Sequence, residues 1–121
     1  MISKMEIAGV HMDIEPKLNK YIVKKIGNMD KYLPRQARES AHVEIKLKEQ
    51  KIKEKKQYTC DVVLYLPHDS IKLSETTMNM FASVDIVETK LKNLIKKYKE
   101  KHTKKRFART IIRKIKSHSI R

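Results

Sequence analysis

The sequence has little cysteine, glycine and proline, and each shortage narrows the class of protein. A single cysteine, Cys60, cannot form an internal disulfide bond. Only two glycines and three prolines occur among 121 residues, so the composition is that of a folded domain and not of a low-complexity linker. No apolar stretch is long enough for a signal peptide or a membrane span, which indicates a cytoplasmic protein.

Acidic residues are also fewer than basic ones, and they are scarcest in the C-terminal third of the chain. The formal net charge is +15, from 29 Lys and Arg against 14 Asp and Glu. Residues 86–121 contain 14 cations and two acids, whereas residues 1–85 contain 15 cations and 12 acids. Such an excess of positive charge is typical of proteins that bind a polyanion, and it predicts an RNA partner bound through the C-terminal third.

What the chain does contain is sufficient for one folded domain. Apolar residues make up 40% of the sequence and charged residues 36%. At 121 residues there is no room for a catalytic domain beside a binding module. We therefore expect one compact core with a densely charged surface.

The first third of the chain predicts a strand and then a helix. Residues 2–10 are rich in β-branched side chains, and Pro16 suits the first turn of a helix, where its missing N–H has no partner to lose. Leu18, Ile22 and Ile26 then recur at helical spacing. The pattern predicts a helix to about Leu33 that stops before Pro34.

The middle of the chain predicts three strands. Apolar and polar residues alternate over 41–48 and again over 58–66, which is the pattern of strands with one buried face. The charged segment 49–56 between them indicates a mobile loop. Residues 67–70 supply turn residues, and Ile71 and Leu73 begin a return strand that forms a hairpin with the strand before it.

A long amphipathic helix is predicted from Asn79, which suits the N-cap position. Its apolar stripe is bordered by two rows of lysine, with Lys90, Lys97 and Lys101 on one side. Lys92, Lys96 and Lys99 lie on the other side. Beyond it, residues 104–121 keep isoleucines at near-helical spacing among cations, and either an amphipathic helix or a tail that orders on a partner fits this pattern.

Three stretches resemble the ribosome hibernation promoting factor and ribosome-associated inhibitor family. Residues 7–18 are similar to the family's first strand and helix entry, residues 79–85 to its entry into the second helix, and residues 90–101 to the basic body of that helix. They occur in the family's order and span roughly residues 5–102. Asn79 and Phe81 stand where the family commonly has Asp and Tyr.

The resemblance implies an α+β fold of order β-α-β-β-β-α, with a four-stranded sheet and two helices on one face, similar to double-stranded-RNA-binding domains. It also implies a ribosome-binding domain over 1–103 and a basic C-terminal extension over 104–121. Members silence ribosomes under stress, and no catalytic role is expected. They bind the small ribosomal subunit where messenger and transfer RNA would sit. Because the family's long members carry a further dimerisation domain, this chain is expected to be a short form.

By motif match, the resemblance assigns RNA contacts to the basic body of the second helix and to the first helix, and we extend them into the extension. These residues are Lys24, Lys25, Lys90, Lys97, Lys99, Lys101, Lys104, Lys105 and Arg106. The expected partner is the small ribosomal subunit with its ribosomal RNA, bound by a monomer in the cytoplasm. No small-molecule substrate and no cofactor are implied.

Three other functions compete with this one. A permanent ribosomal or nucleoid-associated protein would show the same charge, and the apolar residues of 104–121 with their cations also suit an anionic membrane surface. A small enzyme is disfavoured, because the sequence has no nucleophile motif, glycine-rich loop or spaced ligand set. The five histidines are scattered, so no metal is expected.

Overall fold

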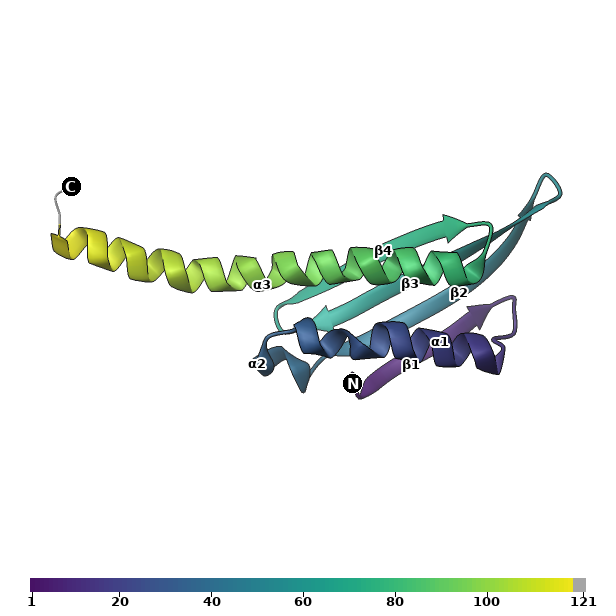
Figure 1. Ribbon diagram of the computed structural model, residues 1–121, viewed down its shortest axis with the longest axis horizontal. Coiled ribbons are helices and arrows are strands. Elements are labelled where there is room, and N and C mark those ends of the chain that lie inside the picture. Colours follow the sequence, from purple (N-terminus) through teal and green to yellow (C-terminus); the bar gives the residue numbers. More distant parts are fainter. Residues whose placement is uncertain (119–121) are drawn as a thin grey trace.

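The computed structural model describes the backbone of residues 1–118 and the side chains of residues 1–101. Eight elements follow one another along the chain (Figure 1). They are β1 (Lys4–Val10), α1 (Pro16–Gly27), the 3-10 helix η1 (Asn28–Tyr32), α2 (Arg35–Arg38), β2 (His42–Ile52), β3 (Lys55–Leu66), β4 (Asp69–Thr77) and α3 (Met80–His118).

The four strands form one mixed sheet in the order β1-β2-β3-β4. β1 runs parallel to β2, and the other two pairs are antiparallel. α1 and α3 both cover the same face of the sheet and leave the other face open (Figure 1). The expected α+β architecture with two helices on one face is confirmed.

The core lies between the helices and the covered face of the sheet. Alternation places every second strand residue in it, as period-two patterning requires. The side chains with at most 1% of their surface exposed include Ile22, Ile26, Leu33, Val43, Ile45, Leu47, Val62, Leu64, Val84, Val87, Leu91 and Ile95.

The first helix ends earlier than its apolar spacing predicts. α1 stops at the buried Gly27, and the side-chain amide of Asn28 donates to the carbonyl of Lys24 at 2.9 Å, which satisfies one of the carbonyls at the helix end. The chain then tightens into η1, which places Met29 in the core. The prediction of a continuous helix to Leu33 is therefore wrong. The sequence pattern also missed α2, one helical turn that buries Ala37.

The segment 49–56 is a hairpin and not a loop. β2 and β3 pair without interruption from His42↔Tyr65 to Ile52↔Lys55, and the chain reverses at Lys53 and Glu54. Both turn residues have positive φ, 50° and 66°, as a two-residue turn between twisted strands requires. The paired tip extends past the last partners on β1 and β4 (Figure 1).

α3 begins where the sequence predicts. The Asn79 side-chain oxygen accepts the backbone N–H of Phe81 at 2.8 Å and of Ala82 at 3.4 Å, which confirms the N-cap. Tyr98 is the last described side chain that packs into the core, and its hydroxyl donates to the carbonyl of Pro67 at 3.3 Å. The helical backbone continues to His118, well past the sheet (Figure 1).

Over residues 104–118, the part of the C-terminal segment whose backbone the structure describes, the chain is helical, as the first of the two readings expects. Among the described residues, none of the helices combines the length and the apolar character that a membrane crossing requires.

Candidate nucleic-acid interface

A groove of about 530 Å³ lies where α1 and η1 run alongside α3. Five of its lining residues are lysines, and Glu88 is the acid among the side chains that line it. We call it the lysine groove and define it by Lys24, Lys25, Lys31, Lys92 and Lys96.

α1 contributes Lys24 and Lys25 from its last turn. The stripe of Leu18, Ile22 and Ile26 is buried, so the helix can present these two lysines only away from the sheet. A cation in the last turn is also favoured by the partial negative charge at a helix C-terminus. The local sequence thus determines which way these two lysines point and places them where the helix C-terminus favours a positive charge.

Lys25 has a structural role in addition to its charge. Its ammonium lies 3.7 Å from a carboxylate oxygen of Glu88 and 3.9 Å from one of Asp85, both on α3. The hydroxyl of Tyr21 also donates to Asp85, and this bond, together with the nearby carboxylate charges and desolvation, raises the pKa of Tyr21 to about 12. Lys25 is therefore a partly neutralised member of the groove that also ties α1 to α3.

Tyr32 lines the groove between two of its lysines. The ammonium groups of Lys31 and Lys92 lie 5.1 Å and 4.9 Å from its ring centre, within the range of a cation–π contact. Hydrogen bonding to Lys92, with the positive charge of both lysines, lowers the pKa of Tyr32 against the opposing effect of desolvation. The lysine groove therefore includes an aromatic ring held between two positive charges.

The other row of lysines on α3 faces away from this groove. Lys90 forms an ion pair with Glu75 of β4, so it borders the sheet and not α1. Lys97 and Lys101 are exposed, and helical spacing puts them on the same flank as Lys90. Lys99 is exposed on the flank of Lys92 and Lys96 but lies beyond the residues that line the groove.

Of the predicted contact residues, the structure thus brings together Lys24 and Lys25 in one groove and leaves Lys90, Lys97, Lys99 and Lys101 outside it. Lys104, Lys105 and Arg106 lie outside the described side chains. The sequence prediction missed Lys31, Tyr32, Lys92 and Lys96 as a group. The row containing Lys92 and Lys96 was visible from helical spacing, but the turn of η1 that carries Lys31 and Tyr32 to it was not.

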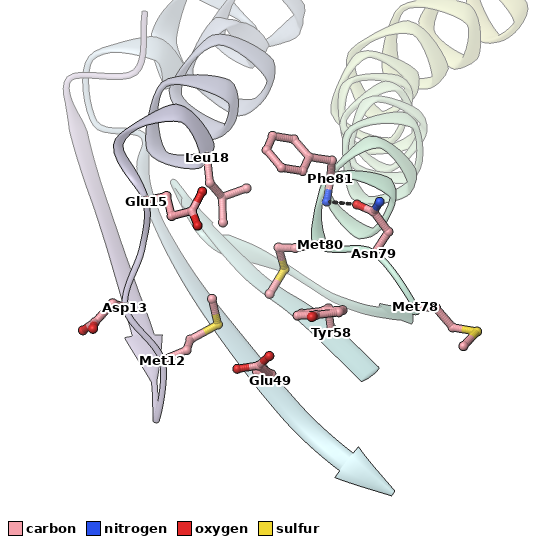
Figure 2. Close-up of a pocket in the computed structure, with 10 residues that line it drawn as sticks. All are labelled: Met12, Asp13, Glu15, Leu18, Glu49, Tyr58, Met78, Asn79, Met80 and Phe81. Carbon is pink, nitrogen blue, oxygen red and sulfur yellow. Dashed lines mark hydrogen bonds between the residues drawn. The ribbon is translucent and has the colours of Figure 1, made fainter. Parts of the chain in front are cut away.

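A second concavity, of about 440 Å³, lies between the N-terminal ends of α1 and α3. Methionines and aromatic rings line it, and the carboxyl groups of Glu15 and Glu49 stand around it (Figure 2). We call it the acid-rimmed pocket, lined by Met12, Asp13, Glu15, Leu18, Glu49, Tyr58, Met78, Asn79, Met80 and Phe81. The helical face therefore has a groove of lysines at the η1 end and a pocket with carboxyl groups at the opposite end.

The fold and the groove define a small α+β protein whose helical face gathers lysines at one end. The family model described as "Sigma 54 modulation protein / S30EA ribosomal protein" matches residues 5–103, which is most of the chain. The chain belongs to this family, and the resemblance inferred from its three sequence stretches is confirmed.

Curated relatives in the family carry the name "Ribosome hibernation promotion factor". The protein of that name from Lactococcus lactis subsp. cremoris is 28% identical over 102 residues, which are 84% of this chain and 52% of that protein. The protein of the same name from Staphylococcus aureus is 24% identical over 102 residues, 84% of this chain and 51% of that protein. The chain thus spans about half the length of these relatives.

Two solved structures have the same fold. A ribosomal subunit interface protein from Coxiella burnetii superposes with a TM-score of 0.64 at 24% identity, covering 79% of this chain and 97% of that one. The N-terminal domain of Protein Y from Thermus thermophilus superposes with a TM-score of 0.59 at 16% identity, covering 77% and 94%. At these identities the likeness establishes the fold.

Proposed function

We propose that this chain is a ribosome hibernation factor. In this proposal it binds the small ribosomal subunit in the channel for messenger and transfer RNA and inhibits translation under stress or in stationary phase. The names of its curated relatives support the hibernation role. The observation that carries the proposal is the lysine groove, a concave surface lined by five lysines of α1, η1 and α3.

The groove is suited to phosphates and not to base recognition. Lysine ammonium groups neutralise phosphates and release their counterions, a contribution that is independent of base sequence. Structured RNA is recognised largely by shape and by contacts to phosphate and sugar. The proposed mechanism is therefore occlusion of an RNA-walled site by a charged body of fitting shape, with no chemical step.

Lys92 and Lys96 provide the sharpest test, because both are exposed in the groove and neither forms an ion pair within the described side chains. The double variant Lys92→Gln/Lys96→Gln removes two positive charges from the groove. A matched control, Lys46→Gln/Lys72→Gln, removes two charges from the exposed face of the sheet.

Cosedimentation with small subunits at several salt concentrations is the measurement. We expect the wild type and the control to bind with the same steep salt dependence. The groove variant should bind roughly tenfold or more weakly, with a logarithmic salt slope about 1.4 to 1.8 units shallower. The groove variant should also inhibit a translation extract less strongly, in proportion to its loss of affinity for the small subunit.

Two results would reject the proposal in different ways. A wild-type protein that migrates free of ribosomes at low salt would reject ribosome binding itself. Equal losses in the groove variant and the control would reject the groove as the contact surface. Constant abundance relative to ribosomes through growth and growth arrest would favour a permanent ribosomal or nucleoid-associated protein instead.

A further inference from the structure

The face of the sheet that no helix covers carries a histidine beside two glutamates. His42 and Glu44 project from the start of β2, and Glu6 projects from β1. The Nε2 atom of His42 lies 3.8 Å from a carboxylate oxygen of Glu6. One ligand atom from each of the three side chains lies within 4.8 Å of the others.

Strand register places the two glutamates of this group side by side. Glu6 and Glu44 are direct partners in the parallel β1–β2 pair, so two like charges stand side by side on one face. The chain has only 14 acidic residues against 29 basic ones, which makes such a pairing conspicuous. The cation that the structure places against Glu6 is His42, which is charged only when protonated.

Tyr65 of β3 holds two of these side chains in place. Its hydroxyl donates to a carboxylate oxygen of Glu44 at 3.2 Å, and its ring lies 5.4 Å from the His42 ring with a 36° tilt. A hydrogen bond to a ligating carboxylate and a packed imidazole are the supports that metal ligands typically receive from neighbouring residues. Three adjacent strands therefore contribute to one small polar site.

We propose that Glu6, His42 and Glu44 bind one divalent transition-metal ion, with Zn²⁺ as the probe. An imidazole with two carboxylates is a donor set that Zn²⁺ accepts, with water completing the coordination. Around a tetrahedral ion with bonds of about 2.1 Å, the ligand atoms stand about 3.4 Å apart. To bind the ion, the ligand atoms must approach one another by about an ångström. The side chain of Glu6 is 72% exposed, so it has room to make this movement.

The charges around the site set its strength. Lys4 is the strand partner of His42, and Lys46 follows Glu44 on the same face, so one ammonium flanks each side of the three ligands. Their repulsion lowers the affinity for a cation, and an exposed site is screened by salt as well. The bound ion would join the edge strand β1 to β2 and stabilise the folded state by mass action.

The site lies on the opposite face of the sheet from the lysine groove. It does not depend on the proposed function, and metal binding and RNA binding should be separable by mutation. His42→Gln, Glu6→Gln and Glu44→Gln are the test variants. His68→Asn is the matched control: His68 is an exposed turn histidine with a φ of 64°, a conformation that Asn tolerates well.

Calorimetric titration of the full chain with Zn²⁺ should give one saturable site in the wild type and in His68→Asn. Each test variant should lose at least about tenfold in affinity, and Tyr65→Phe should lose about tenfold through its bond to Glu44. Binding to small subunits should stay unchanged in all of them. A wild type without a saturable site, or a His42→Gln variant that binds as the wild type does, would overturn the proposal.

A second readout separates coordination from a general attraction of cations. Nitrogen NMR of the imidazoles should show the largest Zn²⁺-induced shift at His42 and little change at His68. Mg²⁺, which prefers oxygen ligands, should not displace Zn²⁺ at comparable concentration. Displacement by Mg²⁺, or equal shifts at all histidines, would show that the imidazole is not a ligand.

Discussion

Two tyrosines on the helical face differ in the charge of their neighbours, and their ionisation should report that difference. The hydrogen bond to Asp85 raises the pKa of Tyr21 to about 12, whereas Lys92 and Lys31 lower the pKa of Tyr32. Both phenols would otherwise titrate near pH 10. The carboxylates of α3 and the lysines of the groove therefore have opposite effects on two tyrosines of the same helical face.

We expect Tyr32 to ionise first and Tyr21 last when ring-carbon NMR shifts of the tyrosines are followed with pH. Since the pKa of Tyr21 is raised in the folded state, its contribution to stability is fully present below pH 10. That contribution falls as the pH rises through about 12. Asp85→Asn should bring the Tyr21 titration back toward pH 10 and leave that of Tyr32 in place. Coincident titration of the two rings would contradict this account of the groove.

At the residue scale, the sequence predicted which side chains are charged and which lie in the core, but not which charges meet. Helical spacing separated Lys92 and Lys96 from Lys90 and Lys97 without specifying which row faces α1. Which row faces α1 depends on the rotation of α3 about its own axis when it packs beside α1. In the structure, the ion pairs of Lys25 with Asp85 and Glu88 are part of that packing. The ligands of the sheet site come from separate strands, so histidine spacing could not reveal them.

At the element scale, the β2–β3 hairpin shows why charge composition misled the prediction. Residues 49–56 are nearly all polar because the hairpin tip has no helix above it, not because the chain is irregular there. Glu49 and Lys56 form an ion pair across the two strands at 3.5 Å. Period-two alternation reports a buried face, and a strand pair exposed on both faces lacks that signal.

The turn of this hairpin is strained by its own residues. Lys53 and Glu54 both adopt the left-handed region, which costs an ordinary L-residue about 1 kcal/mol or more. Lys53→Asn with Glu54→Gly supplies the pair that such a turn prefers and should raise the free energy of unfolding by about 1 kcal/mol in urea titrations. Lys51→Asn, a strand residue beside the turn, is the control and should give no gain. A loss of stability in the turn variant would show that the two-residue turn is misassigned.

α3 divides into an anchored part and a projecting part. Its described core residues end at Tyr98, and the expected boundary at residue 103 lies soon after. Deleting residues 104–121 should therefore leave the unfolding midpoint almost unchanged while flattening the salt dependence of ribosome binding. Lys104→Gln/Lys105→Gln/Arg106→Gln, which keeps the full length, should flatten it in part and so distinguish charge from helix length. An unchanged salt dependence after the deletion would show that the segment makes no contact with RNA.

At the scale of the whole molecule, the two concavities of the helical face differ in the charge of the side chains that line them. The lysine groove lies at the η1 end, from which α3 projects with its further cations, and the acid-rimmed pocket lies at the other end (Figures 1 and 2). Phosphates are attracted to the lysine groove and disfavoured beside the carboxyl groups of the pocket. The protein should therefore bind RNA in one orientation, with the groove toward the phosphates and the pocket away from them.

Site-directed cleavage can measure this orientation, because the native cysteine does not interfere. Cys60 is buried, and burial raises the pKa of its thiol to about 12, which leaves it unreactive toward labelling reagents. An iron chelate attached at Asn93→Cys in the groove should cleave ribosomal RNA strongly. The same chelate at Met78→Cys, whose native side chain is 67% exposed beside the acid-rimmed pocket, should cleave it weakly. Treated wild-type protein should give no cleavage, and stronger cleavage from Met78→Cys would reverse the proposed orientation.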